Sequence, residues 1–70
     1  MNYATCTLEE LTIYTNQIVK WAEKNLADSP KSRAENIFDA IGFFRGVCCS
    51  RALDYAPETI EKWRKIAIGS

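Results

Sequence analysis

Apolar residues recur at helical spacing along three stretches of the chain, and the middle stretch, residues 34–55, is the longest. At about 100° per residue its large apolar side chains gather on one broad face. Ala40, Phe43 and Val47 fall on the opposite side, where a surface helix would be polar. A helix that is apolar nearly all round is usually buried on more than one side. The pattern predicts a central helix near residues 32–55, whose main face holds Ala34, Ile37, Phe38, Ile41, Phe44, Cys48, Cys49 and Ala52.

The segment before it has the pattern of an amphipathic helix, near residues 7–27. Thr7 and Glu10 have the spacing of a capping box, and Cys6 and Leu11 have the spacing of a hydrophobic staple around it. Both features favour a helix start at this point. We expect one wide inward face, made of Leu8, Leu11, Tyr14, Thr15, Ile18, Val19, Trp21, Ala22 and Leu26.

Two prolines separate the three helices. Pro30 disfavours a helical conformation at Ser29, so the first helix ends before it. The central helix then begins either with a second capping box, Ser32 with Glu35, or with Ser29 as cap and Pro30 in the first turn. Pro57 ends the central helix and begins a third one, near residues 57–67, which stops at Gly69 and points Ile60, Trp63 and Ala67 inward.

These elements predict an all-α fold in one domain over residues 1–70: a small three-helix bundle, or a helical hairpin plus a short third helix. A chain of 70 residues buries only roughly 60% of the surface that its unfolded form exposes. Its three cysteines have no framework spacing, and it has no histidine for a zinc site. Oligomerisation remains as the means of supplementing the core.

Composition disfavours several classes of partner. Nine basic and nine acidic residues cancel, so the chain lacks the positive charge typical of proteins that bind nucleic acid or anionic membranes. The longest uncharged run, Leu11–Val19, is too short to span a bilayer. No basic leader precedes an apolar run, and the cysteines suggest a reducing environment. We therefore expect a cytoplasmic protein without a membrane partner.

Catalytic chemistry also finds little support. The chain has no histidine to act as a base, and Cys48 lies mid-helix, far from a helix N-terminus that would lower its pKa. Gly42 and Gly46 lie inside a helix rather than in a phosphate-binding loop. We expect no enzyme, no cofactor, no metal and no small-molecule substrate, and we interpret Cys48 as a packing residue.

A strip of small residues along the central helix, Gly42, Gly46 and Ser50, is the most informative feature. Each mid-helix glycine costs about 1 kcal/mol relative to alanine, and small residues spaced by four let another backbone approach closely. Either another helix of the same chain crosses there, or a second subunit or a helix of another protein does. Our first hypothesis is a protein-interaction or regulatory module, homodimeric through Ala40, Gly42, Phe43, Gly46, Val47 and Ser50.

Arg45 interrupts the apolar stripe of the central helix, and no residue three or four positions away on that helix is acidic. A buried arginine would therefore need a carboxylate from elsewhere. The alternative is that the side chain extends to solvent over its apolar neighbours.

The second functional hypothesis comes from residues 50–65, SRALDYAPETIEKWRK, which resemble the helix-turn-helix DNA-binding motif. The resemblance implies that the third helix would enter the major groove with Thr59, Lys62, Arg64 and Lys65. Asp54 departs from the pattern, because the turn of that motif usually has glycine there. The neutral net charge departs from it as well.

Overall fold

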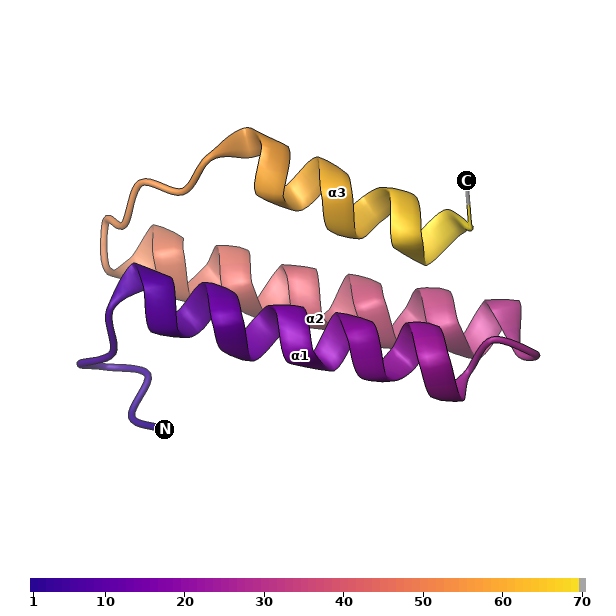
Figure 1. Ribbon diagram of the computed structural model, residues 1–70. Coiled ribbons are helices and arrows are strands. Elements are labelled where there is room, and N and C mark those ends of the chain that lie inside the picture. Colours follow the sequence, from indigo (N-terminus) through magenta and orange to yellow (C-terminus); the bar gives the residue numbers. More distant parts are fainter. Residues whose placement is uncertain (70) are drawn as a thin grey trace.

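The computed structural model describes residues 1–69. It contains three α-helices: α1 (Leu8–Asn25), α2 (Pro30–Ser50) and α3 (Pro57–Ile68). Helices α1 and α2 form an antiparallel hairpin, and α3 runs back along α2 while also contacting α1 (Figure 1). No strand occurs within these residues. The predicted all-α three-helix bundle with a long central helix is therefore confirmed.

Helix α1 begins with the predicted capping box. The Thr7 hydroxyl accepts a hydrogen bond from the Glu10 backbone N–H at 3.0 Å, and Oε1 of Glu10 accepts one from the Thr7 N–H at 2.8 Å. Cys6 and Leu11 are both buried beside this turn, as a hydrophobic staple requires. The helix ends at Asn25, two residues earlier than expected.

Helix α2 begins two residues before the predicted position. Ser29 is the N-cap and Pro30 the first helical residue, so the second of the two predicted starts is confirmed. The capping box of Ser32 with Glu35 is wrong, because both residues lie inside the helix. Within residues 1–69 the Ser29 side chain forms no capping hydrogen bond. This helix start therefore depends on the fixed φ of proline.

Helix α2 also ends earlier than predicted, at Ser50 instead of residue 55. The Leu53 N–H donates to the Cys48 carbonyl at 2.8 Å and the Ala52 N–H to the Cys49 carbonyl at 3.3 Å. Ala52 adopts a left-handed φ of 53°. This is a Schellman motif with alanine in the position that glycine usually takes. Residues 51–56 thus form a connection that reverses the chain, and α3 then starts at Pro57 as predicted.

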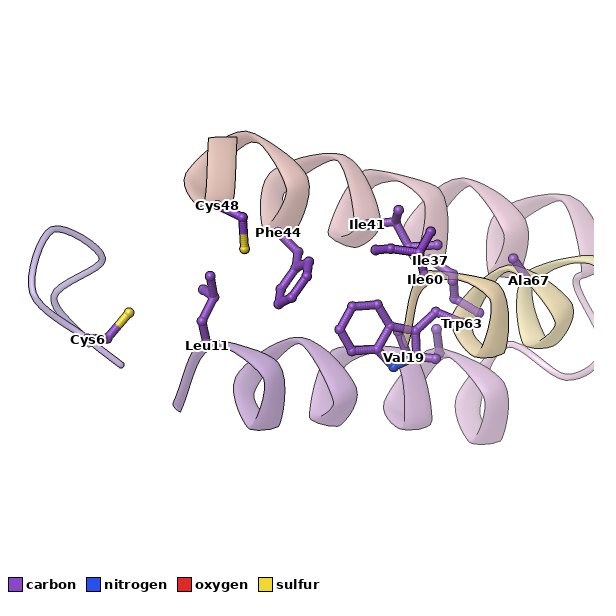
Figure 2. Packing of buried hydrophobic residues seen from close by; sticks show 11 residues of the cluster. Cys6, Leu11, Val19, Ile37, Ile41, Phe44, Cys48, Ile60, Trp63 and Ala67 are labelled. Atoms are coloured by element: carbon purple, nitrogen blue, oxygen red, sulfur yellow. The ribbon is translucent and has the colours of Figure 1, made fainter. Parts of the chain in front are cut away.

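The core lies between the hairpin and α3. Figure 2 shows Trp63 of α3 beside Phe44 of α2. Their rings pack edge to face, with 4.9 Å between the ring centroids. The indole Nε1 of Trp63 donates a hydrogen bond to Oδ1 of Asn16 on α1 at 3.2 Å. One tryptophan therefore ties all three helices together. The buried cluster contains Cys6, Leu11, Val19, Ala22, Ile37, Ile41, Phe44, Cys48, Ile60, Trp63 and Ala67.

Four residues expected on inward faces are exposed instead, and one of them, Ala52, lies beyond the end of α2. Trp21 is 53% exposed and Phe38 is 42% exposed, and Cys49 lies on the surface. The predicted faces of α1 and α2 were wider than the surface that two neighbouring helices can cover. Each helix buries only the sector that points to both neighbours, and apolar residues at the edges of the predicted faces remain outside.

Within residues 1–69, none of the three helices is long and apolar enough to cross a membrane.

Candidate interaction surface

The strip of small residues on α2 is open. An ideal Cβ built on Gly42 or on Gly46 meets no other atom within 4 Å among residues 1–69, apart from the helix's own neighbouring backbone. Neither α1 nor α3 therefore crosses α2 at the strip, and the intrachain crossing is ruled out. Ser50, at the end of the strip, is exposed and donates from its hydroxyl to the Val47 carbonyl at 3.1 Å.

The other predicted interface residues lie in different environments. Ala40 is only 7% exposed and belongs to the core side of α2. Val47 is partly buried and packs against the core cluster. Phe43 is 39% exposed and lies at the border between the core and the outer surface. The structure therefore brings Phe43 and the open strip to the surface, while Ala40 and Val47 are used by the chain itself.

An aromatic cluster surrounds Phe43. Tyr3 lies in the segment before α1. Its ring packs edge to face against Phe43, with 4.8 Å between the centroids, and lies tilted against Tyr14, with 5.8 Å between the centroids. Interaction with the Tyr14 side chain raises the pKa of Tyr3 above its ordinary value. The three rings link the N-terminal segment to α1 and α2 without adding charge.

This cluster borders a groove of about 300 Å³ between α1 and α2. No residue of α3 lines it, so it opens on a side of the hairpin that α3 leaves free. The groove combines apolar rings with two polar side chains of α2, and it is lined by Tyr3, Tyr14, Ile18, Asn36, Asp39, Ala40 and Phe43.

Arg45 extends to solvent, which resolves the two alternatives drawn from its position. It lines a second groove, of about 410 Å³, together with Leu53, Tyr55 and the open glycines of α2. No carboxylate within residues 1–69 forms an ion pair with it, since the salt bridge found there joins Arg64 to Glu61. Arg45 therefore adds a free positive charge beside the small-residue strip.

The three cysteines differ in their burial. All three cysteines are free, and Cys6 and Cys48 are buried at the end of the core near the C-terminus of α2 (Figure 2). Burial raises the pKa of Cys48, with a smaller opposite effect from the Arg51 charge. Arg51 donates to the Tyr3 carbonyl at 2.8 Å and to the Cys6 sulfur at 3.5 Å, and so anchors the N-terminal segment.

The residues of the helix-turn-helix hypothesis lie along α3 but are not a purely basic surface. Lys62, Arg64 and Lys65 are exposed, whereas Thr59 is half-buried. Arg64 pairs with Glu61 at 2.9 Å. Helix α3 runs back antiparallel to α2 after a connection of six residues, 51–56 (Figure 1). A helix-turn-helix has a turn of three or four residues and a crossing near 90–120°.

Over residues 1–69 no group of three or more metal-ligating side chains converges. Comparisons of the chain with protein-family models, with curated proteins and with solved structures gave no match.

Sequence reasoning missed part of this surface. Tyr3 precedes the first predicted helix and so has no predicted role, whereas Tyr14, Ile18 and Trp21 are all predicted to point into the core. The pairing of Tyr3 with Phe43 depends on the path of the N-terminal segment, which has no periodicity to reveal it. For Tyr14, Ile18 and Trp21 a signal was available: the apolar face of the first helix is wider than the neighbouring helices can cover.

Proposed function

We propose that this protein is a small non-enzymatic interaction module that acts as a homodimer, with the outer surface of α2 around Phe43 in the contact. A regulatory role through protein contacts, in the cytoplasm, belongs to the same proposal. The observation that carries it is the open strip. Gly42 and Gly46 lie in the middle of a helix, yet within residues 1–69 no atom of another element packs against them.

The energetic argument concerns the glycines. Each costs about 1 kcal/mol of helix stability relative to alanine, and neither has a positive φ to justify it. A chain with so small a core gains from any added stability. Close packing of a helix from a second subunit would explain these glycines, since small residues spaced by four allow two helix axes to come near each other.

Phe43 supplies the apolar part of the contact. It is 39% exposed, and the Tyr3 ring packs edge to face against it. Burying a phenylalanine side chain contributes about 1.5–3 kcal/mol, and a twofold contact uses it in both subunits. A half-exposed aromatic ring is well suited to anchor such a contact.

Sedimentation equilibrium of Phe43→Glu against wild type tests the proposal. We expect wild type to dimerise and Phe43→Glu to stay folded, with helical circular dichroism retained and the mass halved. Phe38→Glu is the matched control, because Phe38 has a similar exposure, 42%, on the same helix but lies outside the groove. Dimerisation that is unchanged in Phe43→Glu, or lost equally in Phe38→Glu, would overturn the assignment of this surface.

DNA binding through α3 is the alternative function, and the exposed Lys62, Arg64 and Lys65 favour it. Glu58 and Glu61 alternate with these bases along α3, so phosphate attraction is weakened. We expect no retention on mixed duplex DNA at low salt, where attraction is strongest. Retention that is lost on raising the salt and in Lys62→Glu would favour the alternative instead.

A further inference from the structure

A stripe along α1 lies outside both the core and the contact with α3. Glu10, Tyr14, Gln17, Trp21 and Lys24 follow one another at spacings of four, three, four and three residues. These are the spacings of the seam of a coiled coil, so the side chains share one line along the helix. Trp21 lies in the C-terminal part of α1, and its side chain is 53% exposed. Large, exposed tryptophans on a regular seam are typical anchors of helix contacts.

The stripe and Phe43 lie on the same side of the molecule. Tyr14 and Ile18 line the groove that Phe43 also lines. Asn16, whose side chain bonds to Trp63 of α3, lies on the opposite side of α1 from Tyr14. A partner that covers Phe43 therefore reaches the stripe on α1 without meeting α3.

The two ends of the stripe carry opposite charges. Glu10 lies in the first turn of α1 and Lys24 in the last, about 21 Å apart at 1.5 Å per residue. Two copies paired in parallel would bring Glu10 to Glu10 and Lys24 to Lys24. Two copies paired antiparallel would bring each Glu10 to Lys24 of the partner subunit, and each Trp21 to Tyr14 of the partner subunit. Charge complementarity thus selects a second, antiparallel copy as the occupant.

We propose that two copies pack α1 against α1 in antiparallel orientation about a twofold axis near Gln17, with Phe43 flanking the seam. This inference rests on the proposed homodimer and adds its second helix and its orientation. The capping box occupies Oε1 of Glu10, so Oε2 accepts from Lys24 of the partner subunit. Because the axis passes near Gln17, that position lies next to itself across the contact.

Cross-linking tests the axis. Gln17→Cys is made in a Cys49→Ser background, which removes the exposed native thiol, and is oxidised with copper phenanthroline. We expect rapid formation of a covalent dimer that keeps the helical circular dichroism of the parent. Lys20→Cys in the same background is the matched control, exposed on α1 but off the stripe, and should cross-link much more slowly. Equal or faster cross-linking of Lys20→Cys, or of Ser50→Cys on α2, would overturn the α1 pairing.

Charge variants test the orientation. Glu10→Gln keeps the capping hydrogen bond, since glutamine also serves in a capping box. In the antiparallel dimer it should raise the dimer dissociation constant about two- to fivefold, because it removes one ion pair at each end. In a parallel dimer the same change would lower the constant by relieving repulsion. Lys24→Glu should raise the dimer dissociation constant about tenfold, whereas Lys20→Glu should raise it less than about twofold. Adding Glu10→Gln to Lys24→Glu should recover part of the lost affinity.

The failure of this inference is distinguishable from failure of the proposed function. A wild-type dimer that Phe43→Glu dissociates, but that neither cross-links at Gln17→Cys nor responds to Lys24→Glu, would leave the homodimer in place and refute its α1 seam. A wild-type monomer at high micromolar concentration would refute both.

Discussion

The backbone N–H of Leu53 donates to the carbonyl of Cys48 at 2.8 Å, and this bond closes the C-terminus of α2. The chain needs a left-handed residue at Ala52 to make it, with φ of 53°. After this turn, residues 51–56 reverse the chain, and α3 runs back along α2 on the core side (Figure 1). An alanine in a left-handed conformation therefore stands at the turn from which the chain reverses toward α3.

Ala52→Gly should stabilise the protein. A left-handed conformation costs a residue with a Cβ about 1–2 kcal/mol, and glycine avoids most of that cost. After the extra chain entropy of glycine is subtracted, we expect a gain of about 1 kcal/mol, or a rise of about 4–8 °C in Tm. Thermal unfolding followed by circular dichroism measures it. Ala34→Gly, inside α2, is the control and should lose about 1 kcal/mol; a loss in both variants would contradict the Schellman motif.

Gly46→Ala separates the stability of the fold from association. The added methyl meets open space, so the monomer should gain up to about 1 kcal/mol in its free energy of unfolding. A larger side chain, in Gly46→Leu, should weaken dimerisation about tenfold or more by steric exclusion while the chain still folds. Urea unfolding and sedimentation measure the two effects. Gly69→Ala is the contrasting control, because φ is 75° there and a Cβ would lie 2.9 Å from Nη2 of Arg33, so stability should fall.

The helix ends could be predicted from sequence where a particular residue type marks them. The capping box at Thr7, the proline at position 57 and the left-handed Gly69 each mark a helix end by residue type, and each prediction is confirmed. The C-terminus of α2 has no such residue, because an alanine, Ala52, occupies the left-handed position where glycine usually indicates a helix end. Helical periodicity continues through Ala52 and so extended the predicted helix too far.

The candidate site was less predictable for a related reason. Periodicity gives the direction of each side chain around its own helix, but it does not say how wide a sector the neighbouring helices cover. Gly42 and Gly46 were identified from spacing alone, whereas their openness depends on where α3 packs. The exposure of Trp21 depends on the same packing.

Thiol reactivity should follow burial. Cys49 is exposed, while Cys48 is 1% exposed and burial raises its pKa, so little thiolate forms at neutral pH. We expect fast labelling of Cys49 and slow labelling of Cys48 in the native protein, measured by mass spectrometry. Cys48→Ala should lower the free energy of unfolding by about 0.5–3 kcal/mol through lost packing. Labelling of Cys48 as fast as Cys49 would contradict a structural role.

The capping box should make stability depend on acid pH. The hydrogen bond from the Thr7 backbone N–H lowers the pKa of Glu10, with a smaller effect in the same direction from the Thr7 side chain. The contribution is therefore present above the ordinary carboxyl pKa and lost as pH falls through the lowered one. Urea unfolding in a Phe43→Glu background excludes effects of association. The stability difference between that parent and its Glu10→Gln derivative should shrink with acidification, more than for Glu9→Gln; a constant difference would contradict the assignment.

The central claim is that the free side of the α1–α2 hairpin holds a second copy of the chain. Sedimentation equilibrium up to high micromolar concentration tests it most directly. We predict that wild type approaches twice the chain mass of 8.0 kDa, and that Phe43→Glu sediments at 8.0 kDa with its helicity retained. A wild-type mass of 8.0 kDa across the whole concentration range would contradict the account.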